Sequence, residues 1–222
     1  MKSIWAIVWK DIIIELRTKE LFSSMFTFAL LIIIIFSFTF GFSVEFIPIA
    51  APGILWVAFT FAGMLGLSRS FAIEKEGNSI LGMLLSPVDR SCIFLGKMIG
   101  NMIFVFIVEA IILPIFVLFF NYNLFSNFPS LLIVIFLGTI GFVSVGTLFS
   151  AMAVNTKLRE VLLPVLLFPV IIPVIVSSVK LIGAILDGKS VGEAGSSLQI
   201  LVSFDIIFLV ICTIVFEYVI EE

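Results

Sequence analysis

Long apolar runs alternate along this chain with short polar breaks. Uncharged residues fill 21–44 and 46–68, and a polar cluster at 121–130 divides the long apolar stretch that follows residue 97. About 20 apolar residues are enough for one helix to cross the hydrocarbon core of a bilayer. The pattern therefore predicts an all-α integral membrane fold in a single transmembrane domain, residues 1–222. Its six spans are expected at about 21–44, 46–68, 98–120, 129–154, 161–179 and 199–219.

Residues 3–18 precede the first span and have helical periodicity. The expected apolar stripe consists of Trp5, Val8, Trp9, Ile12 and Leu16, and the opposite side carries Lys10, Asp11, Arg17 and Thr18. Tryptophan favours the depth of the lipid headgroups. The pattern thus predicts an amphipathic helix lying in the membrane interface. The alternative is a helix that packs against the bundle.

Residues 68–97 form the only long charged island, with seven charges in thirty residues. We expect 69–97 to be a cytosolic coupling loop that carries a short helix, capped by Asn78 or Ser79 and ended by Pro87. The apolar ridge of this helix is Ile80, Leu81, Leu84 and Leu85, and its acidic flank is Glu74 and Glu76. A short helix of this kind suits the groove of a partner protein. The alternative is a ridge that lies flat on the bilayer.

Lysine and arginine are distributed unevenly between the two sides of the predicted bundle. Ten of the twelve fall at the N-terminus, in the island or at 157–159, and only Lys180 and Lys189 fall on the other side. Cytosolic loops of membrane proteins carry the excess of positive charge. We therefore expect the island and both termini in the cytosol.

Composition supports a membrane protein and excludes several functions. The chain is 62% hydrophobic and 12% charged, with a mean hydropathy of +1.34, whereas soluble domains are about 25% charged. The net charge of −3 and the lack of a basic cluster argue against a nucleic-acid partner. Histidine is absent, which removes the commonest metal ligand and general base. Cys92 and Cys212 are expected at different membrane depths, without a disulfide, and no cleavable signal peptide is expected.

Glu109 lies near the centre of the third predicted span. An ionised carboxylate there costs at least about 2.5–3.5 kcal/mol, so we expect this group to be protonated or to face a polar cavity. Pro114, five residues on, frees a backbone carbonyl and can bend the helix. The pair is therefore a candidate for a transport path, and the alternative is an interhelical hydrogen bond that holds the bundle together. Asp205 is expected to reach the interface from the outer part of the sixth span.

Small residues recur at helical spacing in several spans. They are Gly96 with Gly100, Ala62 with Gly66, and Gly138, Gly141, Ser144 and Gly146. Such residues let helices approach closely. The pattern leaves open whether the partner helix belongs to the same subunit or to another.

Residues 183–190, GAILDGKS, match the phosphate-loop pattern G-x-x-x-x-G-K-S. A functional phosphate loop follows a buried strand and opens a helix. This segment follows a predicted membrane span on the non-cytosolic side, so we expect a turn between two spans and no nucleotide site.

Three segments carry a resemblance to a known family. ELRTKE near the N-terminus, the run PGILWVAFTFAGMLGLSRSFAIEKE and the run LLSPVDRSCIFLGKMIGN resemble the cytochrome c maturation permease family, CcmB. The likeness is strongest over 52–101 and weak over 184–197. It implies a membrane subunit of the ABC-2 exporter type that works with a separate ABC ATPase subunit, a haem-handling membrane protein, a small helper subunit and a periplasmic haem chaperone.

The resemblance also implies where the ATPase docks and what is moved. The coupling residues would be Glu74, Glu76, Ile80, Leu81, Leu84, Leu85, Pro87, Asp89 and Arg90. The subunit would not be an enzyme and would bind no cofactor, with ATP acting only through the partner and haem as the implied substrate. A histidine-ligated haem site is excluded by composition. We expect a multi-pass protein of the bacterial inner membrane that pairs with a second permease copy.

Three other functions compete with this interpretation. One is a non-transporting scaffold that couples ATP use to release of the chaperone, and another is an ABC-2 exporter of a different hydrophobic substrate. An ion-coupled carrier is disfavoured, because such carriers have several intramembrane ionisable groups and only Glu109 is expected to lie deep.

Overall fold

Seven helices make up the part of the chain that the structure describes. We describe the protein from a computed structural model that places residues 2–40, 47–77, 79, 82, 85–120, 128–154, 156, 158–188 and 195–219. The helices are α1 (Lys2–Thr18), α2 (Glu20–Phe40), α3 (Ile47–Glu76), α5 (Arg90–Phe120), α6 (Phe128–Ala153), α7 (Arg159–Leu186) and α8 (Gly195–Val219). The helices α2 to α8 are the six that are long and apolar enough to cross a membrane. The chain is thus a multi-pass membrane protein, and the predicted fold class is confirmed.

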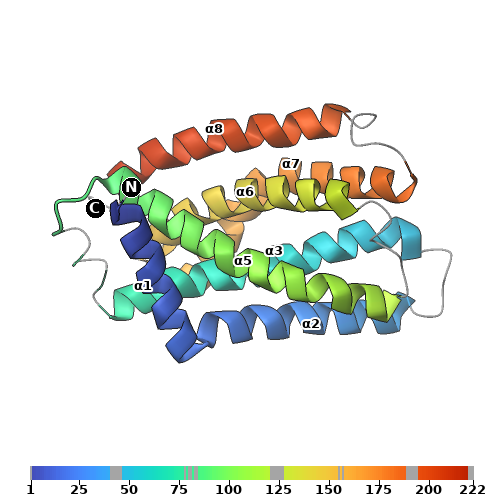
Figure 1. Ribbon diagram of the computed structural model, residues 1–222, viewed down its shortest axis with the longest axis horizontal. Coiled ribbons are helices and arrows are strands. Elements are labelled where there is room, and N and C mark those ends of the chain that lie inside the picture. The colour runs from blue at the N-terminus through green and yellow to red at the C-terminus, as the bar shows by residue number, and fades with distance from the viewer. Residues whose placement is uncertain are drawn as a thin grey trace.

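Helix α6 is the centre of the bundle and α8 lies at its edge (Figure 1). Sixteen of the 26 residues of α6 are buried, compared with six of the 25 in α8. The reason is the small-residue face of α6, which lets neighbouring helices approach on several sides. Large apolar side chains on the outer face of α8, such as Ile206 and Ile214, are exposed, as expected for a surface that contacts lipid.

Helix α1 lies across one end of the bundle at a steep angle to the spanning helices (Figure 1). The C-terminal end of α8 and the connection between α3 and α5 lie at this same end. A sharp turn at Lys19, with φ of 57°, separates α1 from α2. The carboxylate of Glu15 then accepts hydrogen bonds from the backbone N–H groups of Leu21, at 3.3 Å, and Phe22, at 2.7 Å. A negative group at this position stabilises the start of α2.

The helices extend further than the apolar runs. Helix α3 continues through Glu76 and α5 begins at Arg90, so only 77–89 remain between them. Helix α7 likewise continues to Leu186, past the expected end of the fifth span at residue 179. The sequence pattern marks where apolar character ends, but a helix continues wherever its backbone and side chains still find partners.

The small residues bring helices of the same subunit together. An added Cβ at Gly96 would lie 2.9 Å from Ile7 on α1, and one at Gly66 would lie 2.3 Å from Met25 on α2. The closest approach is at Gly138, where an added Cβ would lie 2.1 Å from the ring of Trp56 on α3. Of the two alternatives left open by the sequence, packing within one subunit is therefore the one observed at these glycines.

The segment that matches the phosphate-loop pattern lies at the end of α7. Gly183 is inside this helix, and Gly188, with φ of 78°, follows its last turn. Glycine is favoured there because a left-handed residue commonly ends a helix. The segment thus begins inside a helix, whereas a phosphate loop follows a strand.

Candidate functional site

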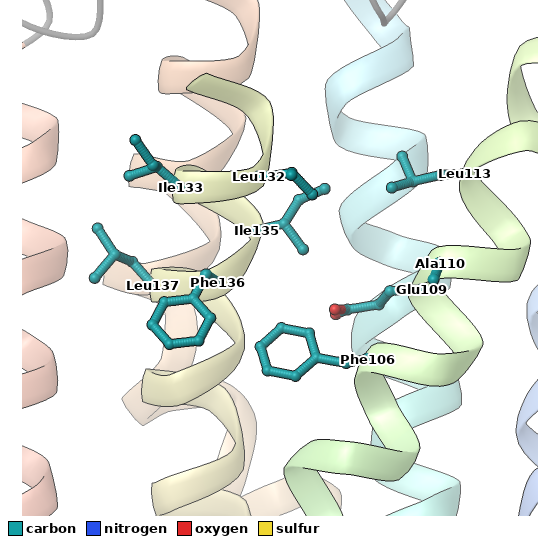
Figure 2. Close-up of a pocket in the computed structure, with 9 residues that line it drawn as sticks. All are labelled: Phe106, Glu109, Ala110, Leu113, Leu132, Ile133, Ile135, Phe136 and Leu137. Atoms are coloured by element: carbon teal, nitrogen blue, oxygen red, sulfur yellow. The ribbon is translucent and has the colours of Figure 1, made fainter. Parts of the chain in front are cut away.

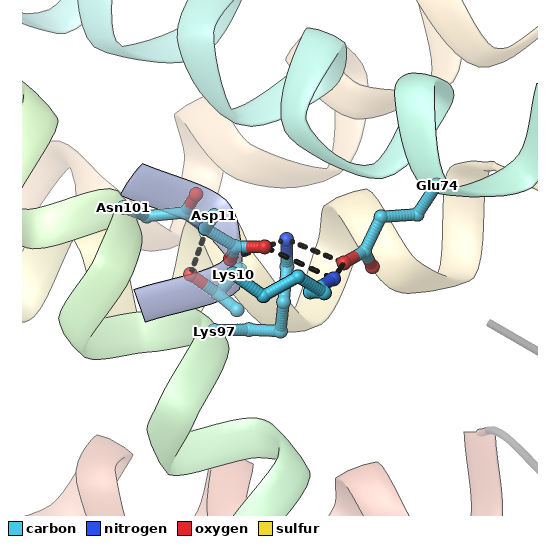
Figure 3. Close-up of polar contacts among 6 residues, drawn as sticks. Lys10, Asp11, Glu74, Lys97 and Asn101 are labelled. Atoms are coloured by element: carbon cyan, nitrogen blue, oxygen red, sulfur yellow. Dashed lines mark hydrogen bonds and ion pairs between the residues drawn. The ribbon is translucent and has the colours of Figure 1, made fainter. Parts of the chain in front are cut away.

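Four charged side chains meet where α1 crosses α3 and α5 (Figure 3). The Lys97 ammonium lies 2.9 Å from Asp11 and 3.1 Å from Glu74. The Lys10 ammonium lies 3.0 Å from Asp11 and also pairs with Glu74. Each carboxylate thus contacts both ammonium groups, and the four charges sum to zero. We call these four residues the charge cluster.

The charge cluster is shielded from solvent, and this burial sets the free-energy cost of removing one of its charges. Asp11, Glu74 and Lys97 are buried, and Lys10 is partly exposed. Burial opposes the charge on Lys10, but the attraction of Glu74 and Asp11 outweighs it, so the pKa of Lys10 is raised. Lys10 therefore keeps its charge beside the two carboxylates. Removal of any one leaves an uncompensated buried charge, which is strongly destabilising.

A cavity of about 20 Å³ adjoins the charge cluster. It is lined by Asp11, Glu74 and Lys97, and the Oε2 atom of Glu74 has no hydrogen-bond partner in the described part of the chain. A space of about 10–15 Å³ or more holds one water. The cavity is thus large enough for a single water that satisfies this oxygen.

Two further contacts tie the same end of the bundle to α6. The ammonium of Lys75 donates to the backbone carbonyl of Val154, just after α6, at 2.8 Å. The amide of Asn101 on α5 donates to the hydroxyl of Thr147 on α6 at 3.1 Å (Figure 3). Consecutive residues, Glu74 and Lys75, therefore connect the last turn of α3 to α1, α5 and the end of α6.

These contacts overturn part of the expectation for residues 3–18. Asp11, expected on the solvent side, is buried in the charge cluster, and Val8, expected on the lipid-facing stripe, is fully buried against the bundle. Trp5, Trp9 and Leu16 are exposed, at 62%, 64% and 70%. Helix α1 thus has both properties that the sequence left as alternatives, because one face packs on the bundle while the tryptophans remain free for the interface.

The predicted coupling residues divide into three groups. Glu74 was expected on an exposed acidic flank, and that expectation is wrong because it is buried in the charge cluster. Glu76, Leu85, Pro87 and Asp89 are exposed, and the half-buried Arg90 donates to the backbone carbonyl of Glu217 at 3.4 Å. The ridge residues Ile80, Leu81 and Leu84, and the proposed cap Asn78, lie outside the described residues.

Glu109 lies at the floor of an apolar groove between α5 and α6 (Figure 2). Its Oε1 accepts a hydrogen bond from the hydroxyl of Thr139 at 2.8 Å, whereas its Oε2 is buried without a partner among the described residues. The groove encloses about 590 Å³ and is lined by Phe106, Ala110, Leu113, Leu132, Ile133, Ile135, Phe136 and Leu137 besides Glu109. Pro114 lies outside this lining and is exposed. The interhelical hydrogen bond and a cavity are therefore both present at Glu109.

Asp205 does not reach the interface as expected. It is the eleventh residue of α8, about 15 Å along a helix that crosses a hydrocarbon core of about 30 Å. Its side chain is 6% exposed, and neither carboxylate oxygen has a partner in the described structure. Glu109 is thus not the only deep ionisable group, which weakens the argument used against an ion-coupled carrier.

Comparison with known proteins assigns the chain to a family. A family model described as CcmB protein matches residues 2–221. The chain is 28% identical over 172 residues to the heme exporter protein B of Pseudomonas aeruginosa, covering 78% of this chain and 76% of that protein. It is 24% identical over 186 residues to the heme exporter protein B of Rhodobacter capsulatus, covering 84% and 85%. Because the family model spans almost all of its residues, this chain belongs to the CcmB family.

Proposed function

We propose that this chain is the membrane permease subunit of an ABC transport complex that exports haem for the assembly of c-type cytochromes. The proposal is supported by membership of the CcmB family and by relatives named heme exporter protein B. ATP is hydrolysed by a separate subunit. The permease subunit converts the movement of that ATPase into movement of its own helices.

The charge cluster is the observation on which the proposed mechanism rests. It joins α3 and α5, the two helices on either side of the connection 77–89, and it joins both of them to α1. An ATPase that pushes on this connection therefore acts on three helices that move together. Lys75 extends the link to the end of α6. A push at one end of the bundle thus reaches its central helix.

The proposed partners follow from the family resemblance, and the proposed orientation in the membrane follows from the distribution of lysine and arginine. They are the ABC ATPase, a haem-handling membrane protein, a small helper subunit, a periplasmic haem chaperone and a second copy of this chain. The excess of lysine and arginine at the end that carries α1 supports a cytosolic location for this end in a bacterial cell, by the positive-inside rule. The protein would then lie in the inner membrane, with the exposed Trp5 and Trp9 at the cytosolic interface.

The groove at Glu109 is the candidate path for the substrate. Its volume of about 590 Å³ falls within the range of about 300–1,000 Å³ that is usual for ligand sites. Its lining is apolar apart from Glu109 and is partly open on the lipid side, since Ile133 and Phe136 are 51% and 49% exposed. A flat, largely apolar substrate such as haem suits this lining, as does another hydrophobic substrate of an ABC-2 exporter.

A second candidate function uses the same docking segment but requires no path for a substrate through the subunit. In that case the subunit is a scaffold that couples ATP hydrolysis to release of the haem-loaded chaperone. The hydrogen bond from Thr139 to Glu109 favours this candidate, because it gives Glu109 a structural role between α5 and α6.

Co-purification of the ATPase tests the docking proposal. Substitution of both Leu81→Asp and Leu84→Asp is expected to detach the ATPase while the subunit stays in the membrane, because charges replace the apolar ridge. Leu158→Asp is the matched control, since Leu158 is 70% exposed in the connection between α6 and α7 at the same end. Retention of the ATPase by the double variant would contradict the proposal.

A further inference from the structure

Asp205 occupies the middle of the buried stripe of α8. Six residues of this helix are buried, and four of them are large and apolar or a thiol: Leu201, Phe204, Cys212 and Phe216. An apolar residue at position 205 would continue the stripe. Position 205 is instead an aspartate that is more than nine-tenths buried, and neither of its carboxyl oxygens has a hydrogen-bond partner among the described residues.

Gly141 on α6 provides the space for this carboxyl group. An added Cβ at Gly141 would lie 2.6 Å from Asp205 Oδ1, and 3.2 Å from both Phe204 and Val174. The carboxyl group therefore lies against the backbone of α6 at Gly141, and the other two atoms nearest to the added Cβ, on Phe204 and Val174, are apolar. Any side chain at position 141 would displace it.

Among the residues that the structure describes, no cation is placed to neutralise Asp205. Helix α6 contains no charged residue, and the nearest lysine along α7, Lys180, is exposed and six residues beyond Val174. On α5, Lys97 belongs to the charge cluster and Glu109 is bound to Thr139. The remaining charges, Arg90 on α5, Arg159 and Glu160 on α7 and Glu217 on α8, lie within the first or last few residues of their helices, far from the midpoint of α8.

We propose that Asp205 is a proton-binding site at the interface of α6 and α8. A carboxylate without a cation or a hydrogen-bond donor is costly inside a bilayer, and one bound proton removes the charge. The proton is held while α8 packs on Gly141 and is released when the two helices separate enough to admit water. Opening and closing of this interface then releases and takes up one proton. This inference does not depend on what the protein transports.

Infrared spectroscopy of the full chain in lipid nanodiscs at neutral pH tests the bound proton. Asp205→Asn is nearly isosteric and uncharged, so the fold is expected to persist. The C=O band of one protonated carboxylic acid, present in the wild type, is expected to disappear. Glu217→Gln is the control on the same helix, because Glu217 is exposed, and it should remove no such band. An unchanged acid band in Asp205→Asn overturns the proposal.

A hydrophobic carbodiimide provides a second test that requires no substitution. This reagent modifies protonated carboxyl groups inside membranes, and mass spectrometry of the wild-type chain is expected to locate a modification on Asp205. Absence of modification at Asp205, under conditions that modify another buried acid, overturns the proposal even where a variant does not fold.

The dependence on packing is tested at Gly141. Gly141→Ala places a methyl group against Oδ1 and is expected to separate α8 from α6, with loss of the acid band and of carbodiimide labelling at Asp205. Gly183→Ala is the matched control, because nothing lies within 4 Å of an added Cβ there. Full labelling of Asp205 in folded Gly141→Ala would show that the proton does not depend on this contact.

Discussion

Lys97 Nζ lies 2.9 Å from Asp11 Oδ2, in a buried ion pair between α5 and α1 that joins residues 86 apart in the sequence. The glycines that flank Lys97 explain how the pair forms. Gly96 lies against Ile7, and an added Cβ at Gly100 would lie 3.2 Å from Asp11 Oδ2. Small residues thus let α1 approach α5 closely enough for an ammonium and a carboxylate to meet away from water.

The first prediction concerns the removal of one buried charge. Lys97→Met is expected to lower the free energy of unfolding by about 3–5 kcal/mol, because Asp11 and Glu74 lose a shared cation while buried. Denaturant unfolding of the purified protein, followed by circular dichroism, measures the loss. The double variant Lys97→Met with Asp11→Asn leaves Lys10 paired with Glu74. Its loss of unfolding free energy should therefore be smaller than the sum of the losses of the two single variants.

An exposed ion pair provides the comparison for this prediction. Arg69 on α3 pairs with Glu20 on α2, and their side chains are 39% and 49% exposed. Arg69→Gln is expected to change the stability by no more than about 1 kcal/mol. Equal losses for Lys97→Met and Arg69→Gln would show that burial does not distinguish the two pairs.

The sequence predicted the spans because long apolar runs have few alternatives to crossing a membrane. It did not predict the ends of α3 and α5, because the charges of Arg69, Glu74 and Lys97 were taken as the edge of a solvated loop. A charged residue indicates that the chain leaves the apolar core of the bilayer, but the helix can continue past it where the charge finds an ion-pair partner on another helix. The partners of Glu74 are 64 residues away at Lys10 and 23 away at Lys97, distances that no local pattern encodes.

The candidate sites were predicted unevenly for a related reason. Glu109 was found because an acid in the centre of an apolar run is conspicuous. Asp205 was misplaced because the sixth span was expected to begin at residue 199, only six residues before it. The helix begins at Gly195, so Asp205 is its eleventh residue and lies at about half the depth of a bilayer. The charge cluster was missed altogether. The only local signal for it was the pair Gly96 and Gly100 around Lys97, which indicated that a second helix passes there.

The second prediction distinguishes a permease from a scaffold. Glu109→Gln keeps an oxygen for the hydrogen bond from Thr139 but removes the titratable group at the floor of the groove. If the groove is the substrate path, maturation of c-type cytochromes in cells that carry this variant falls several-fold, while the ATPase still co-purifies. Glu217→Gln, an exposed acid, is the control. Full maturation with Glu109→Gln would favour the scaffold.

The third prediction tests the closest helix contact. Gly138→Ala is expected to cost about 1–3 kcal/mol of stability, because its methyl group would lie 2.1 Å from Trp56 in a packed core. The thermal midpoint measured in detergent reports the change. Gly53→Ala is the control, because an added Cβ there meets nothing within 4 Å and alanine favours a helix. Replacing Trp56 by Leu in the Gly138→Ala background should restore part of the loss.

The fourth prediction fixes the orientation of the bundle with thiol labelling. Cys92 lies in the first turn of α5, at the end of the bundle where α1 and the connection 77–89 lie, and Cys212 is buried. A membrane-impermeant thiol reagent is therefore expected to leave Cys92 unmodified in intact cells and to modify it after permeabilisation. Ser196→Cys in a background without other cysteines is the control for the opposite end, since Ser196 is exposed at the start of α8 and should react in intact cells. Labelling of Cys92 from outside would place the charge cluster on the periplasmic side, where no ATPase could act on it.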